Sequence, residues 1–421
     1  MNKETLKQII VENQEFVQQV SIFPRNITFE ASGNYILTGP RRAGKTFALF
    51  RVIQDLLANG TAITRILYVN FEDERLMEMT SAHLNLLLEA FSELFEHRPQ
   101  IFLDEIQNIE GWEKFARRLA DQGYQTYITG SNAKMLSREM ATTLGGRFSV
   151  KEIHPLSFSE YLSAGGITLE KNWAYSSQRF DIRKKFNDFF YFGGLPEILQ
   201  YKDKRLWLRG LYNKIFFGDI ITRYAIRNDF ALKLMVKKLA ESTHDEISFN
   251  RIKHIIQSSG IRIGTATLIE YVAYLEESYL INRIKNVLSK SSQKEMAGKF
   301  YFMDNGILSL FLMNAETILL ENLVANHLIR NHHEGVFYVR KNHEVDFYIP
   351  EAKRFVQVAF DLSRPETEKR ELAAMQNLST SLDVEEMLVI TFDTEKEVET
   401  PDSTVRFIPA WKWLLMEEAG M

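Results

Sequence analysis

Short apolar runs alternate with stretches of helical periodicity along the N-terminal part of the chain. The apolar runs are rich in strand-forming residues and lie at 34–38, 67–73, 101–103 and 124–132. After the first run, apolar residues recur at helical spacing from 47 to 57, and Gly60 is a suitable stop. Strands that alternate with helices are typical of a parallel sheet sandwiched by helices. We therefore expect an α/β fold here.

The middle of the chain carries two apolar stripes separated by a polar break. The stripes predict a helix, a turn, a second helix and a strand over residues 247–284. The first stripe is Ile252, Ile255 and Ile256, and the second is Leu268, Val272, Leu275 and Leu280. Thr265 or Thr267 can cap the second helix. Residues 281–304 then resemble two strands joined by a polar, lysine-bearing loop, so we expect a winged helix.

The C-terminal part has the pattern of a second α/β region. An amphipathic stretch at 318–330 predicts a helix, and three strand-like runs with turns between them follow within 336–360. The closing segments predict two further strands and a terminal helix that Trp411 and Trp413 pack.

Length and composition limit the possible classes of protein. A chain of 421 residues is too long for one compact core, and we expect domains at 1–165, 166–299 and 300–421. The net charge of −4 means that any nucleic-acid contact must use a local basic patch. The absence of cysteine excludes disulfides and thiolate zinc sites. No apolar run approaches the ~18 residues of a membrane helix, so we expect a cytoplasmic protein without membrane contact.

Residues 39–46, with the sequence GPRRAGKT, match the pattern G-x-x-x-x-G-K-[ST]. In this pattern backbone N–H groups surround a phosphate, the lysine reaches the β- and γ-phosphates, and the Thr hydroxyl binds Mg²⁺. The strand before it and the helix after it supply the required context, because the positive end of the helix then faces the phosphates. The predicted ATP contacts are Gly39, Pro40, Arg41, Arg42, Ala43, Gly44, Lys45, Thr46 and Phe47.

An acidic pair, Asp104 and Glu105, follows the apolar run 101–103. Carboxylates at this end of a strand lie where ligands bind in open α/β sheets. A P-loop needs a carboxylate for its metal and a group that places the attacking water. We therefore predict that Asp104 and Thr46 hold Mg²⁺ and that Glu105 orients or deprotonates the water. An acidic strand end without such a role is the alternative.

Two further polar groups are candidates for the same site. The run 124–132 ends in Ser131 and Asn132, and one of these side chains, Asn132 by preference, can touch both the γ-phosphate and the water. Arg147 can stabilise γ-phosphate charge in its own chain or in a neighbour. A simple turn and a surface arginine are the alternatives. Action on a neighbour requires a homo-oligomer, whereas a monomer suffices otherwise.

Several segments follow one another along the chain in a characteristic order, among them GPRRAGKT, IFLDEIQNIEGW, YITGSN, YFGGLPEILQ and HEVDFYIP. Together they resemble prokaryotic AAA-type P-loop ATPases fused to a C-terminal domain of unknown function with a PD-(D/E)xK nuclease-like fold. The resemblance extends from about residue 20 to about residue 415, and the LDEIQ and TGSN blocks are its specific parts. It implies an ATPase domain at 1–165, a helical and winged-helix region at 166–299 and a nuclease-like domain at 300–421. The implied ATP, metal and water residues are Gly44, Lys45, Thr46, Asp104 and Glu105.

The nuclease-like part lacks two of the four groups that such nucleases use. These enzymes bind Mg²⁺ with a helix Glu, a strand Asp and the Glu of an E-x-K motif, whose Lys helps to activate water. Glu321 and Asp346 match the first two positions, whereas Gln357 and Ala359 occupy the E-x-K positions. Gln is a weak ligand for a hard cation, and Ala offers no functional group. We expect a degenerate domain without nuclease activity; a nuclease with a rearranged site is the less favoured alternative.

Basic residues of the predicted wing are candidates for contact with DNA or RNA. Sequence-independent phosphate contacts are possible through Lys285, Lys290, Lys294 and Lys299. The second helix of this region carries Glu270, Glu276 and Glu277, which suit a polyanion poorly. We therefore favour a winged helix that packs against protein.

Together these patterns favour an Mg²⁺-dependent ATPase of AAA type whose nucleotide state controls how its C-terminal domains engage a partner. One alternative is a nucleic-acid-binding module that uses ATP as a switch. Another is an interaction scaffold with little turnover that acts through an unknown protein partner.

Overall fold

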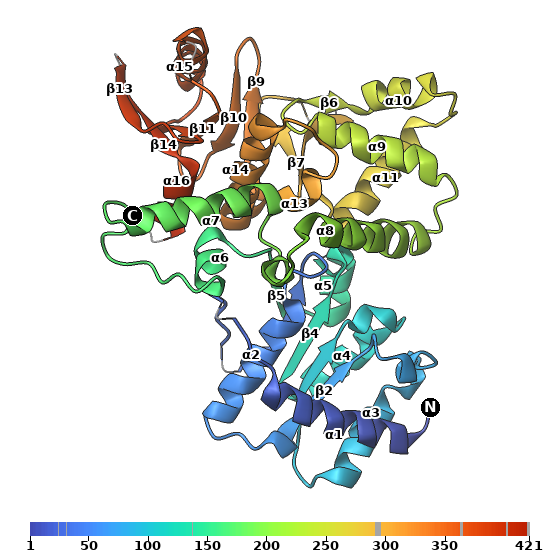
Figure 1. The fold of residues 1–421 in the computed structure, drawn as a ribbon. Helices are drawn as coiled ribbons and strands as arrows, with labels where there is room; N and C mark the ends of the chain where they lie inside the picture. Colours follow the sequence, from blue (N-terminus) through green and yellow to red (C-terminus); the bar gives the residue numbers. More distant parts are fainter. Residues whose placement is uncertain are drawn as a thin grey trace. The chain divides into compact units, whose positions relative to one another are not determined.

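The computed structural model describes residues 1–23, 25–30, 32–136, 138–290, 296–362, 365–400 and 403–418. The chain divides into two compact units, Met1–His154 and Pro155–Met421 (Figure 1). Each unit has its own β-sheet. None of the described helices combines the length and the apolar composition needed to cross a lipid bilayer.

The N-terminal unit is a parallel sheet with the strand order β2-β3-β4-β1-β5. Its strands are β1 (Tyr35–Thr38), β2 (Ile66–Asn70), β3 (Gln100–Asp104), β4 (Thr126–Gly130) and β5 (Ser149–Glu152). Its α-helices are α1 (Lys3–Gln19), α2 (Lys45–Ala58), α3 (Asn85–Leu94), α4 (Trp112–Asp121) and α5 (Arg138–Leu144). Its 3₁₀ turns are η1 (Ile63–Arg65), η2 (Glu74–Leu76), η3 (Ser81–His83), η4 (Ile106–Asn108) and η5 (Ala133–Leu136). Because the strands are parallel, their C-terminal ends share one edge of the sheet.

The two faces of this sheet bury separate cores, as the period of two along a strand requires. Ile36 and Leu103 enter the core that α3 and α4 cover. Tyr35, Leu37 and Phe102 enter the core that α2 covers. Helices therefore lie on both faces of the sheet (Figure 1). Each fully buried side chain of this size contributes about 1.5–3 kcal/mol by leaving water, so the sheet holds the ends of β1 and β3 firmly.

The C-terminal unit contains a mixed nine-stranded sheet with the order β13-β14-β12-β11-β10-β9-β7-β8-β6. The pairs β7–β9, β11–β12 and β12–β14 are parallel and the other pairs are antiparallel. Its strands are β6 (Ile247–Ser248), β7 (Ile281–Asn286), β8 (Ala297–Phe302), β9 (Phe337–Arg340), β10 (Glu344–Ile349), β11 (Arg354–Ala359), β12 (Glu386–Thr391), β13 (Lys396–Thr400) and β14 (Ser403–Pro409).

The helices of this unit precede, interrupt and follow the sheet strands. The α-helices are α6 (Phe158–Ala164), α7 (Gln178–Phe192), α8 (Lys204–Asn213), α9 (Asp229–Glu241), α10 (Phe249–Ser258), α11 (Thr265–Glu277), α13 (Asn305–Leu308), α14 (Glu316–His332), α15 (Pro365–Ser379) and α16 (Ala410–Glu418). A π-helical stretch, η7 (Lys214–Thr222), continues α8, and the 3₁₀ turns are η6 (Pro196–Gln200) and η8 (His333–Gly335).

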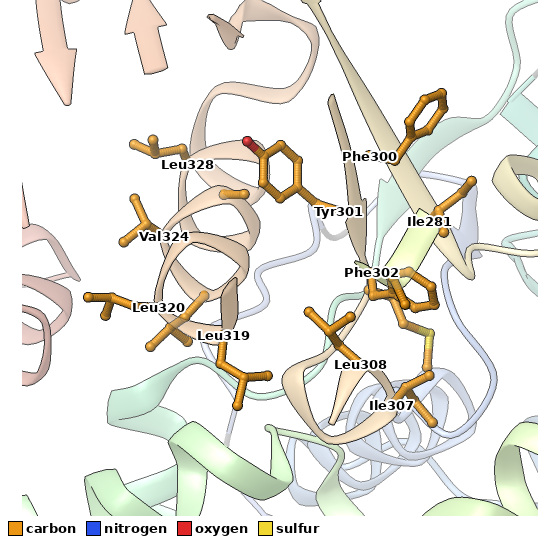
Figure 2. Packing of buried hydrophobic residues seen from close by; sticks show 14 of the residues in the cluster. Ile281, Phe300, Tyr301, Phe302, Ile307, Leu308, Leu319, Leu320, Val324 and Leu328 are labelled. Carbon is orange, nitrogen blue, oxygen red and sulfur yellow. The ribbon is translucent and has the colours of Figure 1, made fainter. Parts of the chain in front are cut away.

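Helix α14 and strand β8 contact each other within the C-terminal core. Figure 2 shows Tyr301 of β8 beside α14, from which Val324 and Leu328 project, and it shows Leu308 of α13 near Phe302. These side chains are almost completely buried. This packing fixes α14 against the sheet, so the polar side chains of α14 and β8 keep the same neighbours.

The predicted α/β fold class is confirmed, with a parallel N-terminal sheet between helices and a second sheet in the C-terminal part. The expected boundaries after residues 165 and 299 stay predictions. The observed second unit begins at Pro155, and β7 and β8 belong to the same sheet as β9 to β14. Within the expected middle region, α10 and α11 are followed by the antiparallel pair β7–β8, in the predicted element order.

Candidate active site

The loop between β1 and α2 depends on backbone conformations that glycine adopts readily. Gly39 has φ of 138°, and a Cβ atom at this position would lie 2.2 Å from the carbonyl oxygen of Ile153. Gly44 precedes α2 with φ of 98°, and none of the described side chains caps the helix there. The first N–H groups of α2 therefore face the loop with their partial positive charge, which favours a phosphate.

Lys45 is buried at the inside of this loop, with 4% of its surface exposed. Its Nζ donates hydrogen bonds to the carbonyl oxygens of Gly39 at 3.1 Å and Pro40 at 3.0 Å. It also lies 3.7 Å from Oε1 of Glu105. The P-loop lysine and the candidate water-activating carboxylate thus meet in one place, as the sequence predicts for an ATP site.

Asp104 is completely buried at the end of β3 and accepts hydrogen bonds from several hydroxyl groups. The Tyr68 hydroxyl donates to Oδ2 at 2.9 Å, and the Thr129 hydroxyl donates to Oδ1. Thr46 of the P-loop also hydrogen-bonds to this carboxylate. Burial and then the charge of Glu105 raise the pKa of Asp104 to about 6, although these hydroxyl groups partly oppose the shift.

Glu105 occupies a left-handed backbone conformation, with φ of 53°, directly after β3. Its N–H donates to the Thr129 hydroxyl at 2.8 Å, which fixes the backbone against β4. Its Oε2 accepts a hydrogen bond from Nε2 of Gln107 at 2.5 Å. Such a conformation costs energy in a residue other than glycine and persists where surrounding contacts determine it. The contacts here aim the side chain toward the P-loop lysine.

The polar end of β4 lies beside these groups. Ser131 is buried, and its hydroxyl lies 3.4 Å from Nε2 of Gln107. Asn132 follows, and its carbonyl oxygen accepts a hydrogen bond from the N–H of Met135. Since β4 lies between β1 and β3, this segment is at the same edge of the sheet as the loop and the acidic pair. The segment after β4 thus lies at the same end of the strands as the P-loop, and the role of Asn132 stays a prediction.

Arg147 lies at the opposite end of the parallel strands, where β1 and β5 begin. It precedes β5, whose first residue Ser149 pairs with Tyr35 at the start of β1, whereas the P-loop follows the end of β1. The Arg147 guanidinium forms an ion pair with Asp121 and donates to the Gly145 carbonyl at 2.9 Å. Parallel pairing thus puts the length of a strand between Arg147 and the P-loop. We correct the expectation of a role within the same chain; a role on a neighbour's nucleotide stays a prediction.

The remaining P-loop residues differ in environment. The Arg41 guanidinium donates to Glu72 at 2.9 Å, whereas Arg42 is exposed with φ of 64°. Ala43 is buried, and its carbonyl oxygen accepts a hydrogen bond of 2.7 Å from Arg25. Phe47 is 41% exposed and lines a small apolar pocket. The other lining residues of this pocket are Ile22, Phe23, Arg25, Ile27, Phe29, Ala48 and Arg51.

One of the four lysines proposed for nucleic-acid contact is unsuitable. Lys299 is fully buried on β8, and its Nζ lies within 3.1 Å of carboxylate oxygens from Glu321, Glu344 and Asp346. The expectation that it binds phosphate is wrong, because solvent does not reach it and carboxylates already pair its charge. Lys285 and Lys290 are partly or fully exposed, and Lys294 lies outside the described residues.

The structure brings together the three polar residues assigned to nuclease-like positions. Lys299 pairs with Glu321 and Asp346, and Oε1 of Gln357 accepts a hydrogen bond from the N–H of Asp346. Ala359 lies on β11, two residues after Gln357. Burial and then the charge of Asp346 raise the pKa of Glu321 to about 8. Among the described residues no cluster of His, Asp and Glu side chains has metal-binding geometry. The ammonium group of Lys299 provides the positive charge among these carboxylates.

Two polar neighbours of the site are not evident from the sequence pattern alone. Tyr68 lies in a buried aliphatic run, where a tyrosine needs a polar partner, and its hydroxyl donates a hydrogen bond to Asp104. Gln107 belongs to the LDEIQ block, and its contact with Glu105 depends on the turn that follows β3.

Comparisons with known proteins agree with this geometry. Residues 32–162 match the family AAA_14, described as an AAA domain, and residues 183–317 match DUF8612, a domain of unknown function. The N-terminal part is thus an AAA-type P-loop domain, a class that binds ATP. The nuclease-like fold expected at 300–421 has no support from these matches and remains a prediction.

The chain belongs to the family of an uncharacterized protein of Methanocaldococcus jannaschii, MJ1544. The two are 33% identical over 430 residues, covering 98% of this chain and 96% of the relative. An uncharacterized protein of Haemophilus influenzae is 28% identical over 338 residues, covering 78% of this chain and 82% of the relative.

Two solved structures match with lower similarity. The Walker-type ATPase PABY2304 of Pyrococcus abyssi has a TM-score of 0.42 at 11% identity, covering 74% of this chain and 95% of that chain. Cdc6 of Pyrobaculum aerophilum has a TM-score of 0.27 at 15% identity, covering 75% of this chain and 95% of that chain.

Proposed function

We propose that the protein hydrolyses ATP in the presence of Mg²⁺ and that the nucleotide state controls how its C-terminal part engages a partner. The observation that supports hydrolysis is the convergence of Lys45, Asp104 and Glu105 at one edge of the sheet. Lys45 lies 3.7 Å from Glu105, and Thr46 hydrogen-bonds to Asp104. These are a phosphate-binding cation, a metal-binding pair and a carboxylate for water, which are the groups that a P-loop ATPase needs.

The donor set suits Mg²⁺. The Thr46 hydroxyl and the Asp104 carboxylate are hard oxygen ligands, and Mg²⁺ in such sites is bound by one or two protein oxygens together with substrate phosphates. A bound cation would also compensate the buried charge of Asp104, whose pKa burial and the charge of Glu105 raise. When bound, Mg²⁺ neutralises charge on the β- and γ-phosphates.

The protein's own residues supply the remaining steps. The N–H groups at the start of α2 and the ammonium of Lys45 bind phosphate oxygens and stabilise the charge that develops on them. Glu105 accepts a proton from the attacking water or holds that water in line with the γ-phosphate. Asn132 is proposed to bond the γ-phosphate from the end of β4.

The partner-engaging surface is proposed to lie in the C-terminal unit. There α10, α11 and the β7–β8 pair form what we propose to be a winged helix, used for protein contact. Contact with DNA or RNA through Lys285 and Lys290 is the second candidate, because both lie on or after β7 and reach solvent. The buried pairing of Lys299 supports a C-terminal part without nuclease activity. Arg147 is proposed to act on a neighbouring chain's nucleotide.

ATP turnover by the purified full-length protein tests the proposal, with and without DNA or RNA. Lys45→Ala should abolish nucleotide binding, and Glu105→Gln should retain binding but lose turnover. Lys114→Ala and Glu110→Gln change exposed residues of the same unit and should behave as wild type. Turnover that is unaffected by Glu105→Gln would refute the assigned chemistry. Stimulation by nucleic acid would favour the second candidate partner over a protein.

A further inference from the structure

Gln107 lies between the candidate catalytic carboxylate and the end of β4, and the proposed reaction has so far given it no role. It belongs to η4, the 3₁₀ turn that follows Glu105. Its Nε2 donates a hydrogen bond of 2.5 Å to Oε2 of Glu105 and lies 3.4 Å from the Ser131 hydroxyl. A hydrogen bond to a carboxylate is among the stronger ones in proteins, so this contact restricts where the Glu105 side chain can point.

The two oxygens of Glu105 are thereby made unequal. Oε2 is held by Gln107, whereas Oε1 lies 3.7 Å from Nζ of Lys45. Rotation of the carboxylate away from the P-loop would break the bond to Gln107. The oxygen that faces the phosphate-binding loop is therefore the one that Gln107 leaves available.

The packing of Gln107 argues against a purely stabilising role. Its Oε1 is buried, and none of the described residues gives it a hydrogen-bond partner. This atom lies so close to Gly130 that a Cβ there would be 2.8 Å away. A buried acceptor without a partner is unfavourable for folding. The Nε2 of this amide therefore makes a favourable contact with Glu105, whereas its buried Oε1 lowers the stability of the fold.

We propose that Gln107 is a positioning residue for ATP hydrolysis, which holds Oε2 of Glu105 so that Oε1 takes the attacking water. This inference rests on the proposed ATPase function. Gln107 acts through Glu105 and makes no contact with the nucleotide. Its loss should thus affect the chemical step and leave ATP binding intact.

Gln107→Met tests this role, because methionine has similar length but donates no hydrogen bond. We expect kcat to fall about 10- to 100-fold, the range for loss of one hydrogen bond to a charged group. KM and the affinity for a fluorescent ATP analogue should stay within about twofold of wild type. Gln107→Asn, which keeps the donor on a shorter side chain, should retain more activity than Gln107→Met.

Two controls separate positioning from general packing. Gln54→Met removes another partly buried amide of the same unit, which donates to the carbonyls of Val17 and Val20 away from the site. It should leave kcat unchanged. In the double variant with Glu105→Gln, Gln107→Met should cause almost no additional loss, since residues that act as a unit are not additive. Wild-type kcat in Gln107→Met, or a full additional loss in the double variant, would overturn the proposal.

A structural measurement covers the case in which the wild type shows no turnover, which would defeat the proposed function. Crystal structures of wild type and Gln107→Met with Mg²⁺ and a non-hydrolysable ATP analogue would then be compared. A Glu105 carboxylate that leaves the P-loop in the variant supports the inference. A carboxylate in the same place in both structures refutes it.

Discussion

The buried ammonium of Lys299 allows a stability prediction whose size follows from its contacts. Lys299→Met keeps much of the side-chain volume but removes the charge that lies within 3.1 Å of Glu321, Glu344 and Asp346. Glu321 and Asp346 are 5% and 7% exposed, so water cannot replace the lost partner. Removing one member of a buried ion pair costs about 3–5 kcal/mol. We expect a loss of that size in the free energy of unfolding.

The loss should depend on pH in a defined direction. Burial and the charge of Asp346 already raise the pKa of Glu321 from 4.5 to about 8. A carboxyl group with a raised pKa in the folded state contributes stability that falls as the pH rises from its unfolded pKa to its folded pKa. Without Lys299 this carboxylate loses its main counter-charge. The deficit of Lys299→Met relative to wild type should therefore be larger at pH 8 than at pH 6.

Urea unfolding followed by tryptophan fluorescence is a suitable assay. Of the five tryptophans, only Trp112 belongs to the N-terminal unit, so the signal reports mainly on the C-terminal unit. Lys290→Met, at an exposed position, is the matched control and should change stability by less than about 0.5 kcal/mol. Adding Glu321→Gln to Lys299→Met should recover part of the loss. A deficit below about 1 kcal/mol at pH 8, or a larger deficit at pH 6, would refute the reasoning.

Three further predictions concern the N-terminal unit. Gly39→Ala should weaken ATP binding at least about tenfold in a fluorescence titration, since its Cβ would lie 2.2 Å from the Ile153 carbonyl oxygen. The control variant Gly60→Ala, which has open space around it, should bind ATP as the wild type does. Mg²⁺-dependent ATP affinity should fall as the pH drops below about 6, because Asp104 then becomes protonated; Asp104→Asn should show little such pH dependence. Arg147→Ala should leave turnover unchanged in dilute, monomeric protein, and a loss seen only at concentrations that support assembly would indicate action on a neighbouring chain.

The P-loop and the acidic pair could be located from sequence because their chemistry is tied to local backbone requirements. Gly39 and Gly44 have positive φ values. Asp104 ends a strand whose burial is evident from its apolar residues, and Glu105 follows that strand directly. Both signals are short-range. The edge at which they meet follows from the parallel arrangement of the strands alone.

The positions of Arg147 and Lys299 depend on long-range pairing, which the sequence does not display. The role of Arg147 depends on its distance from the P-loop, which the register of β5 against β1 decides. Lys299 was counted with the basic residues of a polar loop. Its place on β8, directly before the apolar residues Phe300, Tyr301 and Phe302, was a signal of burial that charge counting overlooked.

The hydroxyl groups around Asp104 have a consequence for the order in which ligands associate. Tyr68, Thr129 and Thr46 come from β2, β4 and α2, and all three hydrogen-bond to this carboxylate. A free cation must compete with these donors for the oxygens of a single side chain. The phosphates of ATP bring additional oxygen ligands that repay the exchange. We therefore expect the metal and the nucleotide to arrive as one complex, so that fluctuations of free Mg²⁺ alone leave the resting protein unaltered.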